Sequence, residues 1–399
     1  MKTKMLGRLA AAGLLAGWVG SAGAQPAVSA WPLFHRDVQR TGRSTVVGPG
    51  PTTPTNVRQV WKGFGALRSS PVIGPDGTVY QASGKQWCAI DPTVGIPIPQ
   101  KWCSDLGGSV VLAQPGLGID PTNPAQIRGY IGARDNKLHA FDQNGMLKWA
   151  FTTGIDGDVQ TAPVFGPDGS IFYGGVTRIH SLDKFGNLQW VQGLDSYVYT
   201  ASPVLAPSGR LYVATLIGTL YAFAPSGINA NPKWELSLEG NVRFGAPAVG
   251  PDGTVYIGTR DGLVAIQDND TSASIKWTFG MGGRGAVSVP AIDTDGTLYI
   301  GGQGTQAGAG ATFFAINPDG TEKWSYPTGG AFRGSPVLDG AGRIYTTTGR
   351  YVVAFDSDAG GPPLWIIPTG RNVYASPALA ADGTLWVGSG DRWLYAISD

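Results

Sequence analysis

Short apolar segments alternate with polar turns along most of the chain, and one type of segment recurs. Each copy starts with a small residue and a proline, continues into a brief apolar run, and reaches Pro-Asp-Gly or a variant of it. A segment of alternating apolar and polar residues follows, as in Thr254–Ile257. Alternation with a period of two is typical of a half-buried strand, and Pro-Asp-Gly favours a tight reversal. The pattern therefore predicts antiparallel strands joined by turns.

The repeat occurs eight times, with its prolines 40 to 48 residues apart. The second copy is degenerate and has an enlarged turn. A period of this length, in a chain with strand patterning, indicates the blades of a propeller rather than helical repeats. The repeat prolines are Pro71, Pro115, Pro163, Pro203, Pro247, Pro290, Pro336 and Pro377.

Two further strands complete each unit. The third carries Ala before Ile or Phe, as in Cys88–Asp91 and His139–Asp142, and the fourth carries a Trp, usually after Lys. Four antiparallel strands in each of eight units predict an all-β fold, an eight-bladed β-propeller. We expect the fourth-strand tryptophans to pack between neighbouring blades: Trp61, Trp102, Trp149, Trp190, Trp234, Trp277, Trp324 and Trp365.

The two ends of the repeat array predict how the ring closes. The last unit has only three strands before the chain ends at Asp399, while Val57–Lys62 forms an isolated fourth strand before the first repeat. We expect this N-terminal strand to complete the last blade, because that arrangement avoids two exposed sheet edges that would invite aggregation. The propeller is thus predicted over residues 57–399.

Composition agrees with a turn-rich β protein. The chain has 61 Gly and 29 Pro in 399 residues, and only 14% of its residues are charged, against about 25% in an average soluble domain. Only three acidic residues are Glu, and the others are Asp, which favours turns over helices. These values argue against a helical protein and a doubly wound α/β enzyme. The 13 Trp, 14 Tyr and 14 Phe argue against a disordered chain.

The first 24 residues are typical of a secretory signal peptide. Three basic residues precede the apolar run Leu9–Gly20, and Ala22–Ala24 offers a cleavage site. The run is too short for a membrane span, although a retained N-terminal anchor is the alternative. No Cys lies near the cleavage point, so no lipid anchor is expected. We predict a periplasmic or secreted protein with a leader over residues 25–56 that packs on the propeller.

Net charge and cysteine content narrow the choice of partners. Without the signal peptide, 26 basic residues face 28 acidic ones. Such a balance gives no general attraction to nucleic acid or to anionic membranes. Two cysteines in an exported chain favour a disulfide, Cys88–Cys103, across one hairpin, with free thiols as the alternative.

The third-to-fourth-strand segments resemble the tryptophan docking motif of pyrroloquinoline-quinone (PQQ) type propellers, best in Ala140–Trp149 and more loosely in Ala354–Trp365. The segment Trp31–Ser44 is similar to the leader of secreted PQQ-like repeat proteins. This resemblance covers Trp31 to Asp399. One branch of that superfamily comprises quinoprotein dehydrogenases, which hold PQQ and calcium in the channel. The other comprises the outer-membrane-protein assembly lipoprotein and related non-catalytic scaffolds.

No catalytic or metal-binding set is evident in the sequence. His139 and His180 occupy the same strand position in different blades, without the spacing of metal ligands, and His35 lies in the leader. No nucleophile elbow, phosphate-binding loop or zinc motif occurs. We therefore predict no catalytic residue, no metal and no cofactor.

Arginine and aromatic residues concentrate in the links from a fourth strand to the next first strand. In a propeller these links surround one mouth of the channel. Arg binds carboxylates through its forked donors, and aromatic rings stack on flat groups or sugars. The alternative is that these arginines pair with nearby Asp residues or bridge blades. Our candidate ligand-binding residues are Arg68, Gln160, Tyr199, Arg243, Phe244, Arg284, Phe332, Arg333, Arg371 and Tyr374, with Arg134, Arg260, Arg350 and Arg392 on adjacent loops.

The leading hypothesis is an exported, non-catalytic scaffold that binds a protein, peptide or glycan through this rim. The resemblance keeps open a small PQQ- and calcium-dependent dehydrogenase. A hydrolase or lyase that uses Asp and Arg residues of the rim is a third possibility.

Overall fold

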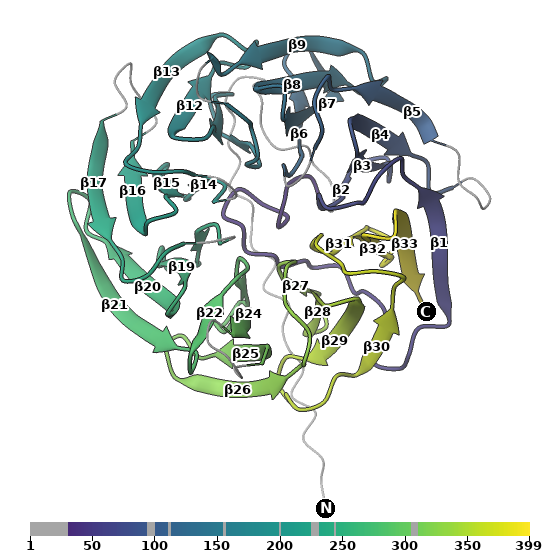
Figure 1. Ribbon diagram of the computed structural model, residues 1–399, viewed down its shortest axis with the longest axis vertical. Helices are drawn as coiled ribbons and strands as arrows, with labels where there is room; N and C mark the ends of the chain where they lie inside the picture. The colour runs from purple at the N-terminus through teal and green to yellow at the C-terminus, as the bar shows by residue number, and fades with distance from the viewer. Residues whose placement is uncertain are drawn as a thin grey trace, which may run out of the picture.

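The computed structural model describes residues 31–93, 100–110, 113–154, 157–198, 201–224, 231–242, 245–304 and 310–399. Their strands form eight antiparallel sheets arranged radially as blades (Figure 1). The predicted eight-bladed β-propeller is confirmed. The predicted signal peptide, residues 1–24, lies outside the described residues. None of the described segments is a helix long and apolar enough to cross a membrane.

The first four blades follow the chain without interruption. Each runs from a short inner strand to an outer strand that carries the Trp. Their strands are β2 (Val72–Ile73), β3 (Val79–Ser83), β4 (Gln86–Ile90) and β5 (Gln100–Asp105) in blade 1; β6 (Gly116–Asp120), β7 (Asn123–Ala133), β8 (Lys137–Asp142) and β9 (Leu147–Thr152) in blade 2; β10 (Val164–Phe165), β11 (Ile171–Gly174), β12 (Arg178–Leu182) and β13 (Leu188–Gly193) in blade 3; and β14 (Val204–Leu205), β15 (Leu211–Ala214), β16 (Thr219–Phe223) and β17 (Pro232–Ser237) in blade 4.

The remaining blades follow the same plan, except that blade 6 has an additional short strand, β22, beside β24. Their strands are β18 (Ala248–Val249), β19 (Val255–Thr259), β20 (Gly262–Asp268) and β21 (Ala273–Gly280) in blade 5; β22 (Arg284–Ala286), β23 (Ala291–Ile292), β24 (Leu298–Gly304), β25 (Thr312–Ile316) and β26 (Glu322–Pro327) in blade 6; β27 (Val337–Leu338), β28 (Arg343–Thr348), β29 (Tyr351–Asp356) and β30 (Trp365–Pro368) in blade 7; and β31 (Ala378–Leu379), β32 (Leu385–Gly388), β33 (Trp393–Ser398) and β1 (Asn56–Lys62) in blade 8.

An aromatic pair recurs inside blades 1 to 7. The second strand supplies a Tyr or Phe whose ring centroid lies 5.8–6.1 Å from that of the fourth-strand Trp. Ring pairs at this distance contribute about 0.5–1.5 kcal/mol beyond the area they bury. The pairs are Tyr80–Trp102, Tyr130–Trp149, Phe172–Trp190, Tyr212–Trp234, Tyr256–Trp277, Tyr299–Trp324 and Tyr345–Trp365.

The fourth-strand tryptophans also contact the next blade. The indole N–H of Trp102 donates to the carbonyl of Gln143 at 2.8 Å, and a Cβ on Gly145 would lie 2.5 Å from the same indole ring. Gly145 also has a φ of 80°, which favours glycine. Similarly, Trp277 donates to the carbonyl of Pro318 at 3.0 Å. The turn between the third and fourth strands of one blade thus rests on the Trp of the preceding blade.

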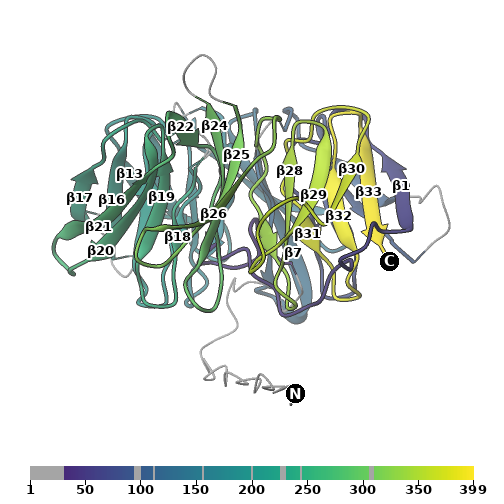
Figure 2. The ribbon, with the colours of Figure 1, turned by 90° about the horizontal axis from the view of Figure 1, so that it is seen from below.

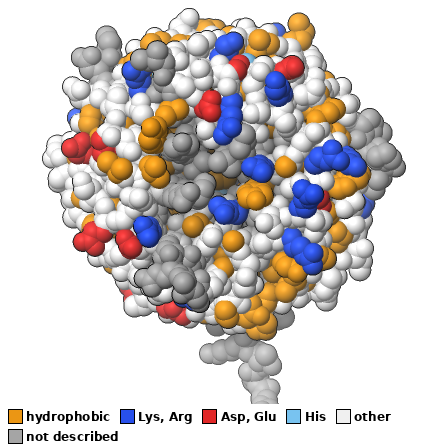
Figure 3. All heavy atoms as spheres, viewed as in Figure 1, with side chains coloured by type: hydrophobic (Ala, Val, Ile, Leu, Met, Phe, Trp, Pro, Cys, Tyr) orange, Lys and Arg blue, Asp and Glu red, His pale blue; other side chains and the backbone are white. Residues whose placement is uncertain are grey.

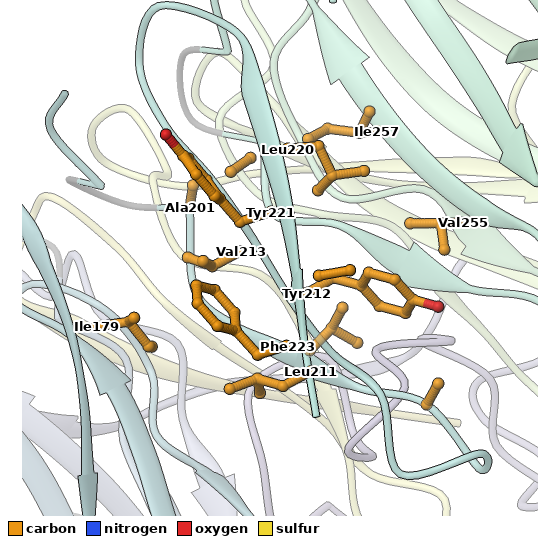
Figure 4. Packing of buried hydrophobic residues seen from close by; sticks show 14 of the residues in the cluster. Ile179, Ala201, Leu211, Tyr212, Val213, Leu220, Tyr221, Phe223, Val255 and Ile257 are labelled. Carbon is orange, nitrogen blue, oxygen red and sulfur yellow. The ribbon is translucent and has the colours of Figure 1, made fainter. Parts of the chain in front are cut away.

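Apolar side chains from adjacent blades pack together in shared buried clusters. In blade 4, Tyr212 of β15 and Phe223 of β16 are buried (Figure 4). Ile179 from β12 and Ile257 from β19 belong to the same buried cluster. Each blade therefore buries both of its faces against its neighbours. β19 is buried along its whole length, so the half-buried strand predicted from the alternation of Thr254–Ile257 is wrong.

The N-terminal strand closes the ring. β1 pairs antiparallel with β33, with Asn56 opposite Ser398 and Lys62 opposite Trp393 (Figure 1). The side chains of Val60 and Trp61 in β1 are buried. The predicted completion of the last blade by an N-terminal strand is confirmed.

The leader lies across one end of the central channel (Figure 2). Its backbone carbonyls accept hydrogen bonds from the innermost strands of six blades, at 2.8–3.0 Å. The donors occupy the same position, two residues after the repeat proline, in each of these blades. The bonds are Ile73 N–H to Trp31 O, Leu117 to Pro32, Leu205 to Val38, Val249 to Gln39, Ile292 to Thr41, and Leu338 to Gly42.

Arg40 anchors the leader at the end of the channel. Its buried guanidinium donates to the carbonyl of Pro203 at 2.9 and 3.0 Å and to that of Phe34 at 3.0 Å. Burial lowers the pKa of Arg40 to about 9. The ring nitrogens of buried His35 lie 2.6 and 2.8 Å from the carbonyl oxygens of Arg40 and Pro336. These contacts fix the leader against several blades at once.

Candidate binding surface at the open mouth of the propeller

Two kinds of loop form the mouth on the face opposite the leader. They are the links between successive blades and the turns between second and third strands. The N–H of Val373 in one link donates to the carbonyl of Gly349 in such a turn at 2.8 Å, and Leu67 donates to Ser389 at 3.1 Å. These bonds hold side chains of adjacent blades side by side. Figure 3 shows this face, with lysine and arginine side chains around a central hollow.

Tyr374 lies between two arginines from different links. The guanidinium of Arg68 is 5.0 Å from the centroid of its ring, and that of Arg333 is 6.0 Å away. Cations within about 6 Å of a ring centroid are attracted to its face. Three of the residues that the sequence indicated as a binding site are therefore brought together by the links that enter blades 1, 7 and 8.

Further cations and aromatic rings extend this cluster. Lys62 lies 5.4 Å from the ring centroid of Trp393, and Arg350 lies 5.4 Å from that of Tyr351. Phe64, in the same link as Arg68, is 58% exposed. We use the name basic arc for the cations that blades 7 and 8 and the neighbouring links contribute to the mouth: Lys62, Arg68, Arg333, Arg350, Arg371 and Arg392.

Five cations of the basic arc have no carboxylate partner among the described residues. The nearby Asp391 accepts hydrogen bonds from the N–H of Gly370 and the hydroxyl of Tyr395, each at 2.7 Å. Pairing with neighbouring Asp residues, one half of the predicted alternative, therefore does not describe these positions within the structure. The other half, arginines that bridge blades, does describe Arg68 and Arg333, which contact Tyr374 of another link. The five are Lys62, Arg68, Arg350, Arg371 and Arg392, all exposed.

Other candidate residues have different environments. Arg134 forms an ion pair with Asp158 at 3.3 Å, as the alternative predicted. Arg284 donates to the carbonyl of Gly310 at 2.6 Å and to that of Met281 at 3.5 Å, so its guanidinium is held within its own blade.

Two candidates lie in the interior rather than on the rim surface. Phe332 is 0% exposed and its ring centroid lies 5.6 Å from that of Phe313. A Cβ on Gly301 would lie 2.3 Å from Phe332, so the ring fills the space that this glycine leaves. Gln160 is also buried. The remaining candidates, Tyr199, Arg243 and Phe244, lie outside the described residues.

The histidines have structural surroundings. His139 Nε2 lies 2.9 Å from a carboxylate oxygen of Asp135. The His180 ring stacks on Tyr173 with centroids 4.9 Å apart, and burial, together with the charge of Arg178, lowers the pKa of His180 to about 4. These two histidines belong to β8 and β12 of different blades.

The described residues do not provide a ligand set for a cation. No group of three or more His, Cys, Asp or Glu gathers anywhere among them. The aspartates of the turns are engaged locally: Asp76 accepts from the N–H and hydroxyl of Thr78 at 3.0 and 2.7 Å, and Asp252 does the same for Thr254. The donor groups of the described chain therefore do not fit a channel calcium site, and we derive no reaction through PQQ and calcium.

The two cysteines form a disulfide within blade 1. Cys88 in β4 lies opposite Cys103 in β5, with their Cα atoms 4.1 Å apart. The predicted disulfide is confirmed, and it joins the third and fourth strands of the blade.

A pocket of about 790 Å³ lies on the leader side, between the first turns of blades 3, 4 and 5. Three of its charged groups are engaged with one another, since Arg210 forms ion pairs with Asp268 and Asp270. Asp268 accepts from Tyr212 at 2.6 Å, Trp234 at 2.9 Å and Arg210 at 3.1 Å. Burial raises the pKa of Asp268, but hydrogen bonds from Tyr212 and Trp234 outweigh it and keep the pKa below its ordinary value. The sequence repeat gave no sign of this pocket, which depends on how three blades meet.

The repeats, the docked tryptophans and the radial sheets define a PQQ-like propeller. The family model described as outer membrane protein assembly factor BamB matches residues 134–276 and 176–399, and the chain belongs to that family. No match is found among curated proteins.

Solved structures of several proteins share the fold. BamB from Moraxella catarrhalis is 16% identical, with a TM-score of 0.64, over 87% of this chain and 99% of that one. Quinohemoprotein alcohol dehydrogenase from Comamonas testosteroni is 14% identical, with a TM-score of 0.68, over 92% and 80% of the two chains. A europium-containing methanol dehydrogenase is 15% identical, with a TM-score of 0.64, over 90% and 89%. At these identities the likeness concerns the fold alone.

Proposed function

We propose that the protein is an exported, non-catalytic scaffold that binds an acidic segment of a partner protein through the basic arc. Membership of a family described as an outer membrane protein assembly factor supports a protein partner. The predicted signal peptide supports a periplasmic or secreted location. A glycan or an isolated peptide with the same acidic chemistry is the alternative ligand.

The observation that carries this proposal is the placement of Tyr374 between Arg68 and Arg333, beside further arginines without carboxylate partners in the described chain. Arginine donates paired hydrogen bonds to carboxylates, and a ring held between cations offers a flat apolar surface beside them. A concentration of cations around a hollow also attracts anionic partners, although the whole chain is nearly neutral.

The first test uses a fluorescent peptide of eight Glu residues and measures anisotropy at several salt concentrations. Arg68→Ala and Arg371→Ala should each weaken binding by about tenfold, and added salt should weaken it further. Lys233→Ala is the matched control, because Lys233 is an exposed cation on β17 in blade 4. Equal binding by all variants would count against the basic arc.

The second test seeks the natural partner. A photo-crosslinking residue at position 374 should capture a protein in the source cells, and Arg68→Ala should reduce that product. The same crosslinker at position 233 should not capture it. Capture of a glycan instead of a protein would favour the alternative ligand.

A third test addresses the dehydrogenase alternative. Purified protein is mixed with PQQ and calcium, and binding and dye-linked oxidation of alcohols and sugars are measured. Tight, calcium-dependent binding with turnover would replace the scaffold proposal by an enzymatic one.

A further inference from the structure

The outer strand of blade 3, β13, has a free edge. Among the described strands it pairs only with β12, so the other side of its backbone faces outward. An unpaired row of N–H and C=O groups is a template for another strand, and natural sheets usually protect such edges with charges, prolines or short lengths.

The other outer strands carry such protection. Five of them have a Lys immediately before their Trp, β1 has two basic residues, and the four-residue β30 ends in a proline. The sequence of β13, Leu-Gln-Trp-Val-Gln-Gly, contains neither a charge nor a proline over six residues. The protective residues elsewhere are Lys101 (β5), Lys148 (β9), Lys233 (β17), Lys276 (β21), Lys323 (β26), Arg58 and Lys62 (β1), and Pro368 (β30).

Gln189 occupies the lysine position in β13. In blade 5 the equivalent Lys276 reaches Asp252 at 3.4 Å and the hydroxyl of Thr254 at 2.8 Å. In blade 3, Gln189 instead accepts a hydrogen bond from the hydroxyl of Ser181 at 2.7 Å. Having Gln instead of Lys at position 189 therefore removes a charge from this edge, while the Gln189 side chain still has a hydrogen-bond partner within the blade.

Apolar side chains are exposed along the same edge. Leu188 is 48% exposed, Val191 is 42% exposed, and Phe185 in the preceding turn is 50% exposed. No other outer hairpin of the described chain contributes three exposed large hydrophobic residues. Leu188 pairs with Leu182 and Val191 with His180, two residues earlier in β12. Residues two apart in a strand share a face, so Leu188 and Val191 form one apolar strip beside an added strand.

We infer that β13 binds an extended, uncharged strand of a partner polypeptide by β-addition. The free backbone edge requires an extended occupant, because only such a backbone matches its hydrogen-bonding row. The strand β13 itself offers no charge to pair with a charged side chain, and its exposed apolar groups favour an occupant with alternating apolar residues. This surface is separate from the basic arc, since β13 lies far around the ring from β30 and β33 (Figure 1).

The test uses a fluorescent eight-residue peptide of alternating Thr and Val with the full-length protein. We expect saturable binding in anisotropy and at least about tenfold slower hydrogen exchange of the amides in residues 188–193. A peptide of the same sequence with every backbone amide N-methylated has no N–H donor on either edge and should not bind. Slower exchange at another strand, or equal binding of the N-methylated peptide, would overturn the inference.

Two variants and a matched control test whether the peptide binds at β13. Gln189→Lys recreates the lysine arrangement of blade 5, so it should fold normally and still bind at least tenfold more weakly. Val191→Lys should act similarly. Thr278→Lys places the same charge at the equivalent exposed position of β21 and should bind like the unaltered protein. Unchanged binding by both β13 variants would overturn the proposal.

A second copy of the chain is the competing occupant. Sedimentation without peptide would detect a dimer, and its loss in Val191→Lys would assign the edge to self-association and overturn partner binding. Arg68→Ala should leave peptide binding at β13 unchanged. The proposal for β13 and the proposal for the basic arc can therefore fail independently, and the two tests distinguish which one is wrong.

Discussion

The hydroxyl oxygen of Ser376 accepts a hydrogen bond from the backbone N–H of Ser335 at 2.7 Å, although the two residues belong to neighbouring blades. The hydroxyl of Ser335 accepts in turn from Val289 at 3.1 Å, and Ser70 accepts from Ser376 at 2.8 Å. All four residues are buried. A chain of hydrogen bonds thus joins successive inner strands around the channel.

Replacing Ser376 by Ala should destabilise the propeller. The change leaves the buried N–H of Ser335 without an acceptor, which costs about 1–3 kcal/mol. Urea unfolding monitored by tryptophan fluorescence measures the difference. Ser325→Ala, at an exposed position of β26, is the control and should change stability by less than about 0.5 kcal/mol. Equal stability of Ser376→Ala and the control would mean that the interblade bond contributes nothing.

The same pattern predicts a stabilising change. Blade 5 has Ala246 where blades 1, 4, 7 and 8 have Ser, and this alanine is buried next to the inner strand of blade 4. Ala246→Ser supplies an acceptor at the position equivalent to Ser376, within reach of the N–H of Ser202. We expect a gain of about 0.5–1.5 kcal/mol in the free energy of unfolding. A loss of stability in the same urea measurement would show that the hydroxyl cannot adopt the repeated geometry.

The disulfide should stabilise blade 1. Cys88 and Cys103 are separated by 15 residues, and closing a loop of this length contributes about 3 kcal/mol by restricting the unfolded chain. The double variant Cys88→Ala, Cys103→Ala should therefore unfold at lower urea, and dithiothreitol should lower the stability of the original protein but not of the variant. A variant as stable as the oxidised protein would contradict this expectation.

Features repeated in every blade could be predicted from the sequence because each occurs eight times along the chain and can be recognised by comparing the copies. The prolines, the fourth-strand tryptophans and the incomplete last unit defined the ring and its closure. The placement of Arg68, Arg333 and Tyr374 at one mouth could also be predicted, since topology alone puts their links there. What topology cannot give is the direction of a side chain within a link, which is why Phe332 and Gln160 proved to be buried.

The path of the leader could not be predicted in this way. Its hydrogen bonds to six blades use backbone carbonyls, which have no side-chain signature, and its sequence contains no repeat. The buried guanidinium of Arg40 is equally hard to foresee, because isolated charges are usually exposed. By contrast, the unprotected edge of β13 has a sequence signal, the Gln189 that replaces the repeated lysine.

His180 should make the protein sensitive to mild acid. Burial and the charge of Arg178 lower its pKa to about 4, from about 6.5 in the unfolded chain. Between these values the unfolded chain binds a proton that the folded chain does not, so stability falls as the pH falls from 6.5 to 4. Below pH 4 both states are protonated and the loss stops. The contribution amounts to about 3 kcal/mol.

His180→Phe should flatten this part of the pH profile. Phe314 fills the equivalent position in blade 6, so the ring fits the repeat. Urea unfolding of both proteins at pH 7 and pH 4.5 measures the effect. The variant should lose less stability over this interval than the original protein. Identical slopes would assign the acid sensitivity to other groups.

The pairing of β1 with β33 should be required for a soluble, closed ring. Removing Val57–Lys62 exposes the outer edge of β33 and takes away the buried side chains of Val60 and Trp61. Deleting one fully buried Trp side chain alone costs about 3–5 kcal/mol. We expect the shortened protein to aggregate and to melt at a lower temperature, as measured by light scattering and fluorescence.

A peptide with the sequence of residues 56–62, added in excess, should restore solubility because it can pair with β33 as β1 does. A scrambled peptide of the same composition is the control, since it has the same charge but not the alternation that buries Val60 and Trp61. Rescue by the native peptide alone would show that the strand acts by pairing. A shortened protein that stays soluble and melts as before would show that three strands suffice for the last blade.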